Sequence, residues 1–261
     1  MEDAQQILNW YILAGVDEFC ADVTQDYVHN KAAKTAPKTE SLPAAPVAMR
    51  PATSLLAQST EAAYVNARKI CSQAQTLDDL KVLVENFEGC ALKFSANSTV
   101  FGYGNSQAEV MIIGEAPGAD EDRLGEPFVG RSGHLLDKML TAINLQRQDC
   151  YITNVLPWRP PGNRTPTDGE VAVCLPFLQR QIELIKPKII FLLGGSAAGA
   201  VLNISSSISQ LRGRMIDYTA ENGLVIPTLS SYHPAYLLRT PTQKAKVWAD
   251  LLRLQRKLAE T

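Results

Sequence analysis

The chain has no long hydrophobic run, and it is poor in histidine and cysteine for its 261 residues. No stretch approaches the roughly 18 consecutive apolar residues that a membrane-spanning helix requires. The N-terminal residues MEDAQQ are acidic, whereas a secretory signal peptide begins with a basic segment. These absences argue against a membrane protein and against a secreted one.

The cysteines do not form a pattern typical of disulfide-bonded proteins. Their number is odd, and they are scattered along the chain, at Cys20, Cys71, Cys90, Cys150 and Cys174. A disulfide framework usually has an even number of cysteines at close spacing. We therefore expect free thiols in a reducing compartment, and hence a cytoplasmic protein without a membrane partner.

The net charge of −2 neither requires nor excludes a nucleic-acid partner, because the local distribution of charge decides such binding. Residues 212–261 contain eight Lys or Arg and four Asp or Glu. This basic bias suits a polyanionic ligand, and a solvated helix face explains it equally well.

The composition changes along the chain in a way that predicts three segments. Residues 1–30 carry apolar side chains at helical spacing and predict an N-terminal amphipathic helical segment. Residues 31–60 are rich in Ala, Pro, Ser and Thr, a composition that buries too little apolar surface to order the chain, so we expect a flexible linker. Residues 61–261 have the alternating pattern of a folded domain.

Within this domain, four apolar runs alternate with segments of helical periodicity. The runs are EVMII (109–113), CYITNVL (150–156), KIIFLLG (188–194) and LVIPTLS (224–230). Capping boxes predict helices after Thr76 and after Thr167, the second extending to about Ile185. Strands that alternate with helices indicate an α/β fold with a parallel sheet covered on both faces. Ligands of such sheets bind beyond the carboxyl ends of the strands.

The loops expected at that edge have unusual sequences. GEAPGADEDRLGEPFVGR, Gly114 to Arg131, follows the first strand, and its glycines suggest a phosphate-binding loop. However, five carboxylates precede the end of this loop with only Arg123 among them, and such a loop would repel phosphate. The other three loops read NVLPWRPPGNRTP, GGSAAG and SYHPAYLLR.

Taken in order, GEAPG with ED, PFVGR, LLDKML, YITNV, RPPGNRTPT and HPAYLLR resemble the motifs of the family-four uracil-DNA glycosylases, over about residues 76–257. The resemblance implies a three-layer α/β/α sandwich with a central four-stranded, mostly parallel sheet. It implies a DNA repair enzyme that flips uracil out of DNA and hydrolyses its N-glycosidic bond, leaving an abasic site. We expect a monomer that acts on single- or double-stranded uracil-containing DNA.

The chemistry of this reaction assigns roles to residues in the matching motifs. Phe128 offers a stacking surface for the base, although a phenylalanine is more often part of a core. Asn154, after the second strand, is able to donate to one uracil oxygen and accept from the adjacent N–H, whereas cytosine presents the reverse pattern. Gly114 completes the uracil-binding set, and His233 is the expected donor to the other uracil oxygen.

The acidic loop supplies the candidates for the attacking water. Glu115 and Glu121 are expected to position this water and to face the cationic sugar of the transition state, which of the two holds the water being left open. Asp120 and Asp122 are interpreted as solvated loop charges. An acidic cluster also suits Mg²⁺ in a nuclease, but the other three loops add no carboxylate before Asp168.

The candidate DNA contacts lie on the other loops. Arg159, Arg164 and Arg239 supply positive charge, and the free N–H groups of a helix opening at Gly195 and Ser196 suit a backbone phosphate. A leucine of YLLR is expected to enter the gap left by the flipped base, as apolar wedges do, or to belong to the core. The two candidates are Leu237 and Leu238.

The sequence departs from the family at the metal site. The resemblance implies a 4Fe-4S cluster held by four cysteines, and the corresponding positions are Phe87, Cys90, Trp158 and Cys174. A cluster of this type takes four thiolates. We therefore expect no cofactor and no metal, with Cys90 and Cys174 as residual cluster-type cysteines and aromatic packing in the vacated space.

Two alternatives to hydrolysis by this scaffold stay open. The first is a protein that binds uracil-containing or abasic DNA without turnover, or covalently. A relative that traps DNA covalently uses a histidine in the loop after the Arg-Pro motif, and PPGNRTP contains none. The second alternative is the metal-dependent nuclease.

Overall fold

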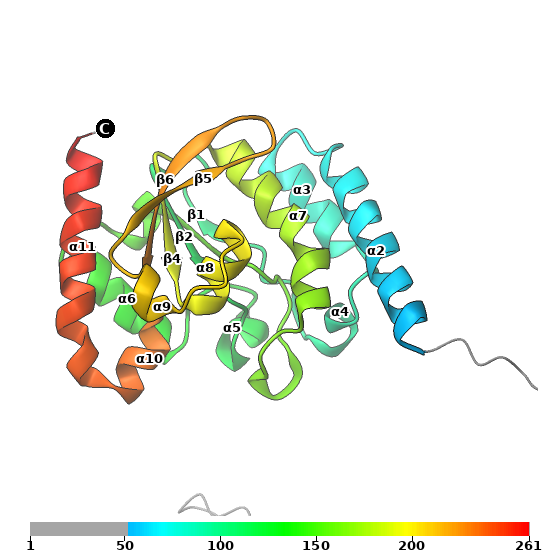
Figure 1. Cartoon of the computed structure of the whole chain (residues 1–261), viewed down its shortest axis with the longest axis horizontal. Helices are drawn as coiled ribbons and strands as arrows, with labels where there is room; N and C mark the ends of the chain where they lie inside the picture. Colours follow the sequence, from blue (N-terminus) through cyan, green and yellow to red (C-terminus); the bar gives the residue numbers. More distant parts are fainter. Residues whose placement is uncertain (1–51, 261) are drawn as a thin grey trace, which may run out of the picture. The chain divides into compact units, whose positions relative to one another are not determined.

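The computed structural model describes residues 52–260, in which helices and strands alternate along the chain (Figure 1). The expected helical segment 1–30 lies outside the described residues, as does most of the expected linker 31–60. Helix α2 (Ala52–Cys71) begins inside that linker. The interpretation of residues 52–60 as flexible is therefore corrected, and the folded domain begins before residue 61.

A six-stranded mixed sheet forms the centre of the domain, with the order β1-β3-β2-β4-β6-β5. The four inner strands are parallel and match the four predicted runs, whereas the two edge strands are antiparallel. The α/β class is confirmed, and the expected count of four strands is too small. The strands are β1 (Tyr103–Gly104), β2 (Val110–Gly114), β3 (Cys150–Asn154), β4 (Ile189–Leu193), β5 (Met215–Thr219) and β6 (Val225–Ser231).

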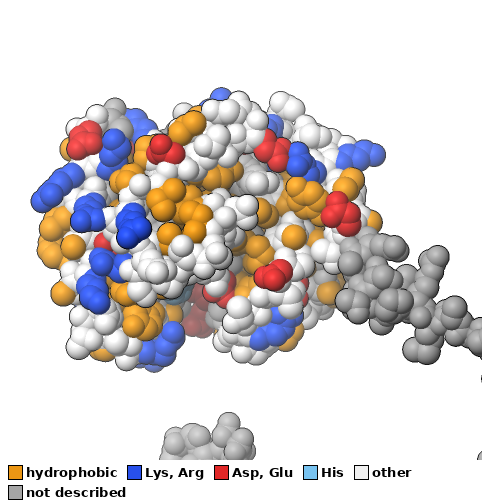
Figure 2. Space-filling view, viewed as in Figure 1, with side chains coloured by type: hydrophobic (Ala, Val, Ile, Leu, Met, Phe, Trp, Pro, Cys, Tyr) orange, Lys and Arg blue, Asp and Glu red, His pale blue; other side chains and the backbone are white. Residues whose placement is uncertain are grey.

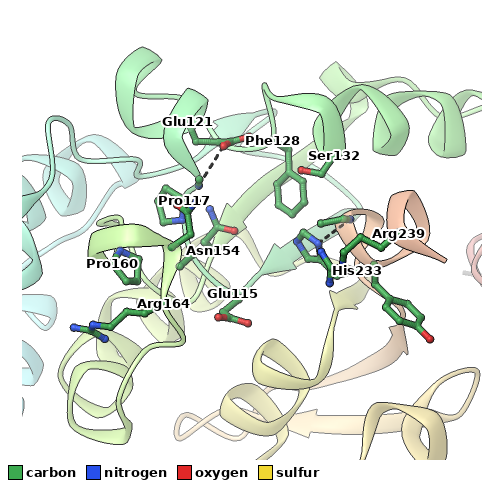
Figure 3. Close-up of a pocket in the computed structure, with 15 residues that line it drawn as sticks. Glu115, Pro117, Glu121, Phe128, Ser132, Asn154, Pro160, Arg164, His233 and Arg239 are labelled. Carbon is green, nitrogen blue, oxygen red and sulfur yellow. Dashed lines mark hydrogen bonds between the residues drawn. The ribbon is translucent and has the colours of Figure 1, made fainter. Parts of the chain in front are cut away.

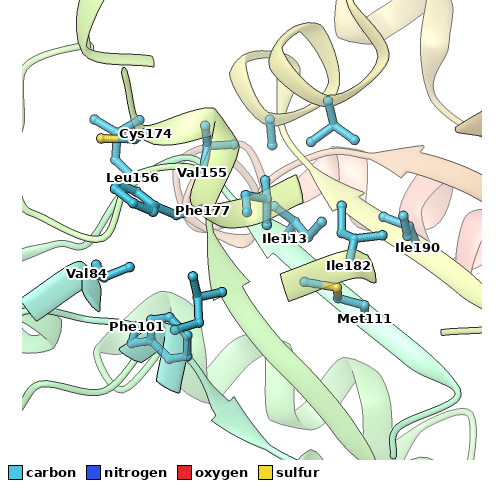
Figure 4. Packing of buried hydrophobic residues seen from close by; sticks show 14 of the residues in the cluster. Val84, Phe101, Met111, Ile113, Val155, Leu156, Cys174, Phe177, Ile182 and Ile190 are labelled. Atoms are coloured by element: carbon cyan, nitrogen blue, oxygen red, sulfur yellow. The ribbon is translucent and has the colours of Figure 1, made fainter. Parts of the chain in front are cut away.

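Alternate residues of the buried strands face opposite helical layers, as expected for a sheet covered on both sides. In β2, Met111 and Ile113 belong to the core shared with α7 (Asp168–Ile185), part of which Figure 4 shows. Val110 and Ile112 belong to the second core, shared with α6 (Arg131–Thr141) and α11 (Lys244–Ala259). Helices therefore cover both faces of the sheet, and Figure 1 shows α7 with α2 on one side and α11 with α6 on the other.

Both predicted capping boxes are present. The Thr76 side chain accepts from the Asp79 N–H at the start of α3 (Leu77–Glu85), and the Thr167 side chain accepts from the Glu170 N–H at the start of α7. Each acidic side chain accepts in return from the backbone of the capping residue. These reciprocal bonds satisfy N–H groups that a helix start leaves free, which fixes where the two helices begin.

The segment interpreted as an acidic loop contains a short helix, α5 (Ala119–Leu124). Its acidic residues lie in the first turn, where negative charge is favourable at the positive end of the helix dipole. None of the helices among residues 52–260 is long and apolar enough to span a bilayer. The remaining helices are α4 (Leu92–Ser95), α8 (Gly195–Leu202), α9 (Ile208–Leu211), α10 (Pro234–Arg239) and the 3₁₀ turns η1 (Arg147–Asp149), η2 (Pro161–Asn163) and η3 (Pro241–Gln243).

Candidate active site

A cavity of about 370 Å³ opens beyond the carboxyl ends of the parallel strands, at the edge that the topology predicts. Glu115, Phe128, Asn154 and His233 line it together, although they come from separate loops (Figure 3). In the space-filling view a hollow at the lower edge of the molecule contains acidic side chains, with Lys and Arg side chains on the flank of α10 and α11 (Figure 2). The structure thus brings the predicted base-binding residues into one pocket.

Phe128 forms one wall of this pocket. It is 4% exposed, and its ring lies 5.5 Å from the His233 ring, with an angle of 30° between the two planes. Its backbone has φ of 54°, the left-handed conformation that costs a residue with a Cβ about 1–2 kcal/mol. An unfavourable backbone conformation at this position indicates that the surrounding contacts dictate the placement of the ring.

Asn154 lies at the floor of the pocket, where β3 ends next to β2. The register pairs Asn154 with Gly114. A Cβ atom at Gly114 would lie 2.4 Å from the Asn154 Oδ1 and 2.6 Å from the Phe128 Cζ, so glycine is required for both side chains to reach this position. Gly114 therefore contributes space, which the sequence motif alone does not reveal.

His233 is held in one neutral form. It is the N-cap of α10, and its Nδ1 accepts from the Ala235 N–H at 3.1 Å, which leaves the proton on Nε2. Burial lowers the pKa of His233 to about 4, with a smaller effect of Arg239 in the same direction, while Glu121 opposes both. At neutral pH the imidazole is therefore an uncharged donor.

The two candidate glutamates differ in what they already bind. Glu121 is 7% exposed, and its oxygens accept from three backbone N–H groups, those of Gly118 (3.1 Å), Val129 (3.0 Å) and Gly130 (2.9 Å). Glu115 lines the cavity, and its carboxylate has no hydrogen bond or ion pair with any residue of the described range 52–260. Figure 3 draws Glu115 among the side chains that line the cavity, below Asn154 and His233 in this view.

Asp122 is not the solvated charge that the sequence suggested. It is 2% exposed, and its carboxylate accepts from the Asn97 N–H and side-chain amide and from the Ser98 N–H. Its Oδ2 also lies 3.9 Å from the Arg159 guanidinium. Asp120 agrees with the expectation, since it is exposed and, within residues 52–260, pairs with Arg123 alone.

The three arginines expected at the DNA-binding surface are not equivalent. Arg159 donates to the Asn163 Oδ1 at 2.8 Å in addition to its Asp122 contact, and it does not line the cavity. Arg164 lines the cavity but forms a bidentate pair with Glu170, which lowers the pKa of that carboxyl to about 2. Arg239 is exposed at the cavity mouth, and no partner among residues 52–260 engages its guanidinium.

The other predicted DNA contacts also separate into two groups. Leu237 is 1% exposed and belongs to the second core, which contradicts a role as a wedge, whereas Leu238 is 39% exposed. Gly195 and Ser196 form the first turn of α8, as expected, but they lie outside the cavity lining.

Several cavity residues were missed in the sequence. Their position within or next to the matching motifs was the available signal, but none carries a charge that would have marked it. They are Ala116, Pro117, Gly118, Ser132, Pro160, Asn163, Ala235 and Tyr236.

The residues at the four ligand positions of the implied cluster all lie in the core shared with α7. Phe87 and Trp158 stack with ring centroids 6.4 Å apart, and Phe177 packs edge-on against both. Trp158 is 1% exposed, and its Nε1–H donates to Thr99 at 3.0 Å. These aromatic rings are fully packed side chains and offer no ligand to iron.

The two residual cysteines complete this packing. The Sγ atoms of Cys90 and Cys174 lie 3.9 Å apart, and both residues are buried. Two thiols and two aromatic rings do not fit a 4Fe-4S cluster, which takes four thiolates. Among the residues described, no group of three or more His, Cys, Asp or Glu side chains is arranged to hold a metal ion.

Comparison with known proteins agrees with this site. Residues 101–252 match the model of the uracil DNA glycosylase superfamily. The chain is 40% identical to the type-4 uracil-DNA glycosylase of Archaeoglobus fulgidus over 69% of its own length and 92% of that protein. It is 41% identical to the type-4 enzyme of Thermotoga maritima over 62% and 83% of the two chains.

Similarity to another type is weaker. The type-5 uracil-DNA glycosylase of Pyrobaculum aerophilum is 31% identical over 58% of this chain and 72% of that protein. The fold is an α/β sandwich, and its pocket, beyond the carboxyl ends of the parallel strands, is lined by an aromatic ring, an amide and an imidazole. Together with the family match, this shows that the chain belongs to the uracil DNA glycosylase superfamily. Within it, the chain is a member of the type-4 family.

Proposed function

We propose that this protein is a monofunctional uracil-DNA glycosylase that removes uracil from DNA by hydrolysis and leaves an abasic site. The observation that carries the proposal is the convergence of Phe128, Asn154 and His233 on one cavity of about 370 Å³. A stacking surface, an amide and an imidazole donor together match the face and the polar edges of uracil.

Recognition of the base follows from the three side chains. Uracil stacks on Phe128, a contact worth roughly 1–3 kcal/mol. The Asn154 amide donates to O4 and accepts from N3–H, whereas cytosine would leave both amide groups mispaired. Sites built on such pairing discriminate by as much as about 10⁴–10⁵.

Cleavage of the bond between C1′ and N1 leaves its electron pair on uracil. The negative charge spreads to O2, where the Nε2–H of His233 donates to it. Because the imidazole is neutral, it stabilises this charge without transferring a proton, and removal of such a donor typically costs about 10²–10³ in rate.

Glu115 holds the attacking water and faces the cationic sugar. Its carboxylate is the free one, since the Glu121 oxygens are occupied by backbone N–H groups. The water oxygen bonds to C1′ and its proton leaves through Glu115 to solvent. For Glu121 we therefore propose a structural role, which is to hold the loop that carries Phe128.

Arg239 and Leu238 make the principal DNA contacts at the mouth, with the start of α8 as a phosphate site. The protein acts as a monomer and needs no iron–sulfur cluster, because Phe87 and Trp158 occupy two of the four ligand positions. No step of the reaction passes through a metal.

An Asn154→Asp variant tests the amide pairing. The carboxylate accepts but does not donate, so uracil excision should fall by roughly 0.5–1.5 kcal/mol in transition-state stabilisation, and the ratio of cytosine to uracil excision should rise. Both rates are measured under single-turnover conditions with a chelator. If a folded variant excised uracil at an unchanged rate, Asn154 would have no role in recognising the base.

A further inference from the structure

Arg147 lies outside the cavity but is joined to its stacking wall. It opens η1, directly before β3, and its Nη1 donates to the Phe128 carbonyl at 2.9 Å, while its Nη2 donates to the Pro127 carbonyl. Asp137 of α6 pairs with the same guanidinium at 3.2 Å. The guanidinium also lies over the Tyr103 ring, 5.1 Å from its centroid. Arg147 is thus oriented by an acid and a ring while it binds two successive carbonyls.

The other side of the same loop is held by Glu121. Its Oε1 accepts from the N–H groups of Val129 and Gly130. Carbonyls of residues 127 and 128 therefore bind a guanidinium, and amides of residues 129 and 130 bind a carboxylate. Two charged side chains from separate elements hold four successive residues around the Phe128 ring.

The backbone of Phe128 needs such support. Its φ of 54° is unfavourable for a residue with a side chain, and it persists only where surrounding contacts dictate it. The start of α6 also packs closely against this loop, because a Cβ atom at Gly133 would lie 1.7 Å from the Phe128 backbone oxygen. Without Arg147, the two carbonyls lose their charged donor, and the loop is free to relax toward an ordinary conformation.

We propose that Arg147 is a positioning residue for base stacking, which holds the Phe128 ring at the angle that receives the flipped base. This inference rests on the proposed function, since it gives Arg147 an effect only through the uracil-stacking residue. Because the Arg147 side chain is only 17% exposed and pairs with Asp137, its charge is used inside the protein.

A double-mutant cycle tests this assignment. Arg147→Ala, Phe128→Ala and the double variant are compared by single-turnover excision from a single-stranded uracil oligonucleotide and by the inhibition constant of free uracil. Arg147→Ala should slow excision roughly tenfold in the otherwise unchanged protein and less than about twofold when Phe128 is already alanine. Arg147→Lys should recover part of the loss, because one ammonium keeps the charge but does not span two carbonyls.

Arg180→Ala is the matched control. Arg180 is 23% exposed, donates to the Ala74 carbonyl through Nε (3.2 Å) and Nη2 (2.7 Å), and pairs with Glu183, and neither residue lines the cavity. It should lower the melting temperature and leave excision and uracil inhibition unchanged.

The outcomes separate the two claims. Multiplicative effects of the Arg147 and Phe128 substitutions would overturn the role of Arg147, as would an Arg147→Ala variant that loses only thermal stability, like Arg180→Ala. A wild-type protein that releases no uracil would instead overturn the proposed function. If Arg147→Ala does not fold, Arg147→Lys is carried through the same cycle and is judged by the same criterion.

Discussion

Gly114 and Asn154 lie opposite each other in the register of β2 and β3, and a Cβ atom at Gly114 would lie 2.4 Å from the Asn154 Oδ1. The same atom would lie 2.6 Å from the Phe128 Cζ. The Asn154 amide and the Phe128 ring, which we propose bind uracil, therefore occupy space that exists because residue 114 has no side chain.

A Gly114→Ala substitution should displace one of these two groups. A misplacement of about 1 Å at a reacting centre costs roughly 10²-fold in rate, so we expect a loss of that order in kcat/KM for uracil excision. Gly169→Ala is the control, since among the described residues its Cβ atom would meet Thr60 alone, at 3.5 Å, an ordinary contact. Equal activity of the two variants would contradict the close approach at Gly114.

His233 provides a pH prediction. Its pKa in the folded protein, about 4, lies below the ordinary value of 6.5, so between these values the unfolded chain binds the proton more readily. The stability from this group is complete above about pH 6.5 and is lost as the pH falls toward 4. Excision that depends on neutral His233 should persist down to about pH 5.

Nitrogen NMR of labelled histidine checks this prediction. The chain contains three histidines, and the His233 signals are those absent in His233→Gln. They should report a proton on Nε2 and a midpoint near 4. A midpoint near 6.5, or a proton on Nδ1, would show that His233 is not a neutral donor with its proton on Nε2.

Iron content tests the aromatic packing at the implied cluster. Protein purified without air should be colourless, contain substoichiometric iron and stay active after dialysis against a chelator. The double substitution Phe87→Cys with Trp158→Cys should destabilise the fold, because truncation of a buried aromatic side chain costs roughly 3–5 kcal/mol. The loss of stability should be smaller than the sum of the two single losses, since the two rings stack on each other. A brown protein with about four irons per chain, unfolded by chelation, would contradict this interpretation.

Leu237 and Leu238 form a matched pair for the DNA wedge. Leu238→Ala should slow excision from duplex DNA and leave excision from single strands unchanged, because a wedge fills the gap in a duplex. Leu237→Ala should instead cost about 2–5 kcal/mol of stability, as expected for a buried leucine. Melting curves and the two substrates separate these effects. Loss of activity on both substrates in Leu238→Ala would assign it another role.

Some of these features could be predicted from the sequence and others could not. The four parallel strands and both capping boxes have local signals, namely apolar runs of strand length and a Thr with an acid three residues later. Edge strand β1 has two residues, too few to show a period. The sequence predicts a loop where α5 lies, because the acidic residues that stabilise its first turn form a run of charge typical of a solvated loop.

The prediction of a solvated charge was wrong for Asp122, because tertiary contacts bury this side chain. Asp122 is buried by Asn97 and Ser98, more than twenty residues earlier, and no local pattern reports such a contact. Glu121 accepts from residues of a loop whose path the sequence does not give. Leu237 and Leu238 are chemically identical neighbours, and only the position of α10 on the core distinguishes them.

The most direct measurement is a mass balance of the reaction. The enzyme is incubated with an excess of a uracil-containing oligonucleotide in the presence of a chelator. The masses of the strand, the free uracil and the protein are then measured by mass spectrometry. We predict an intact strand in which a hydroxyl has replaced the uracil group (loss of one uracil and gain of one water), several uracils released per enzyme, and unmodified protein, with breaks appearing only after alkali. A strand broken without alkali, a protein–DNA adduct, or release that stops at one uracil per enzyme would contradict this prediction.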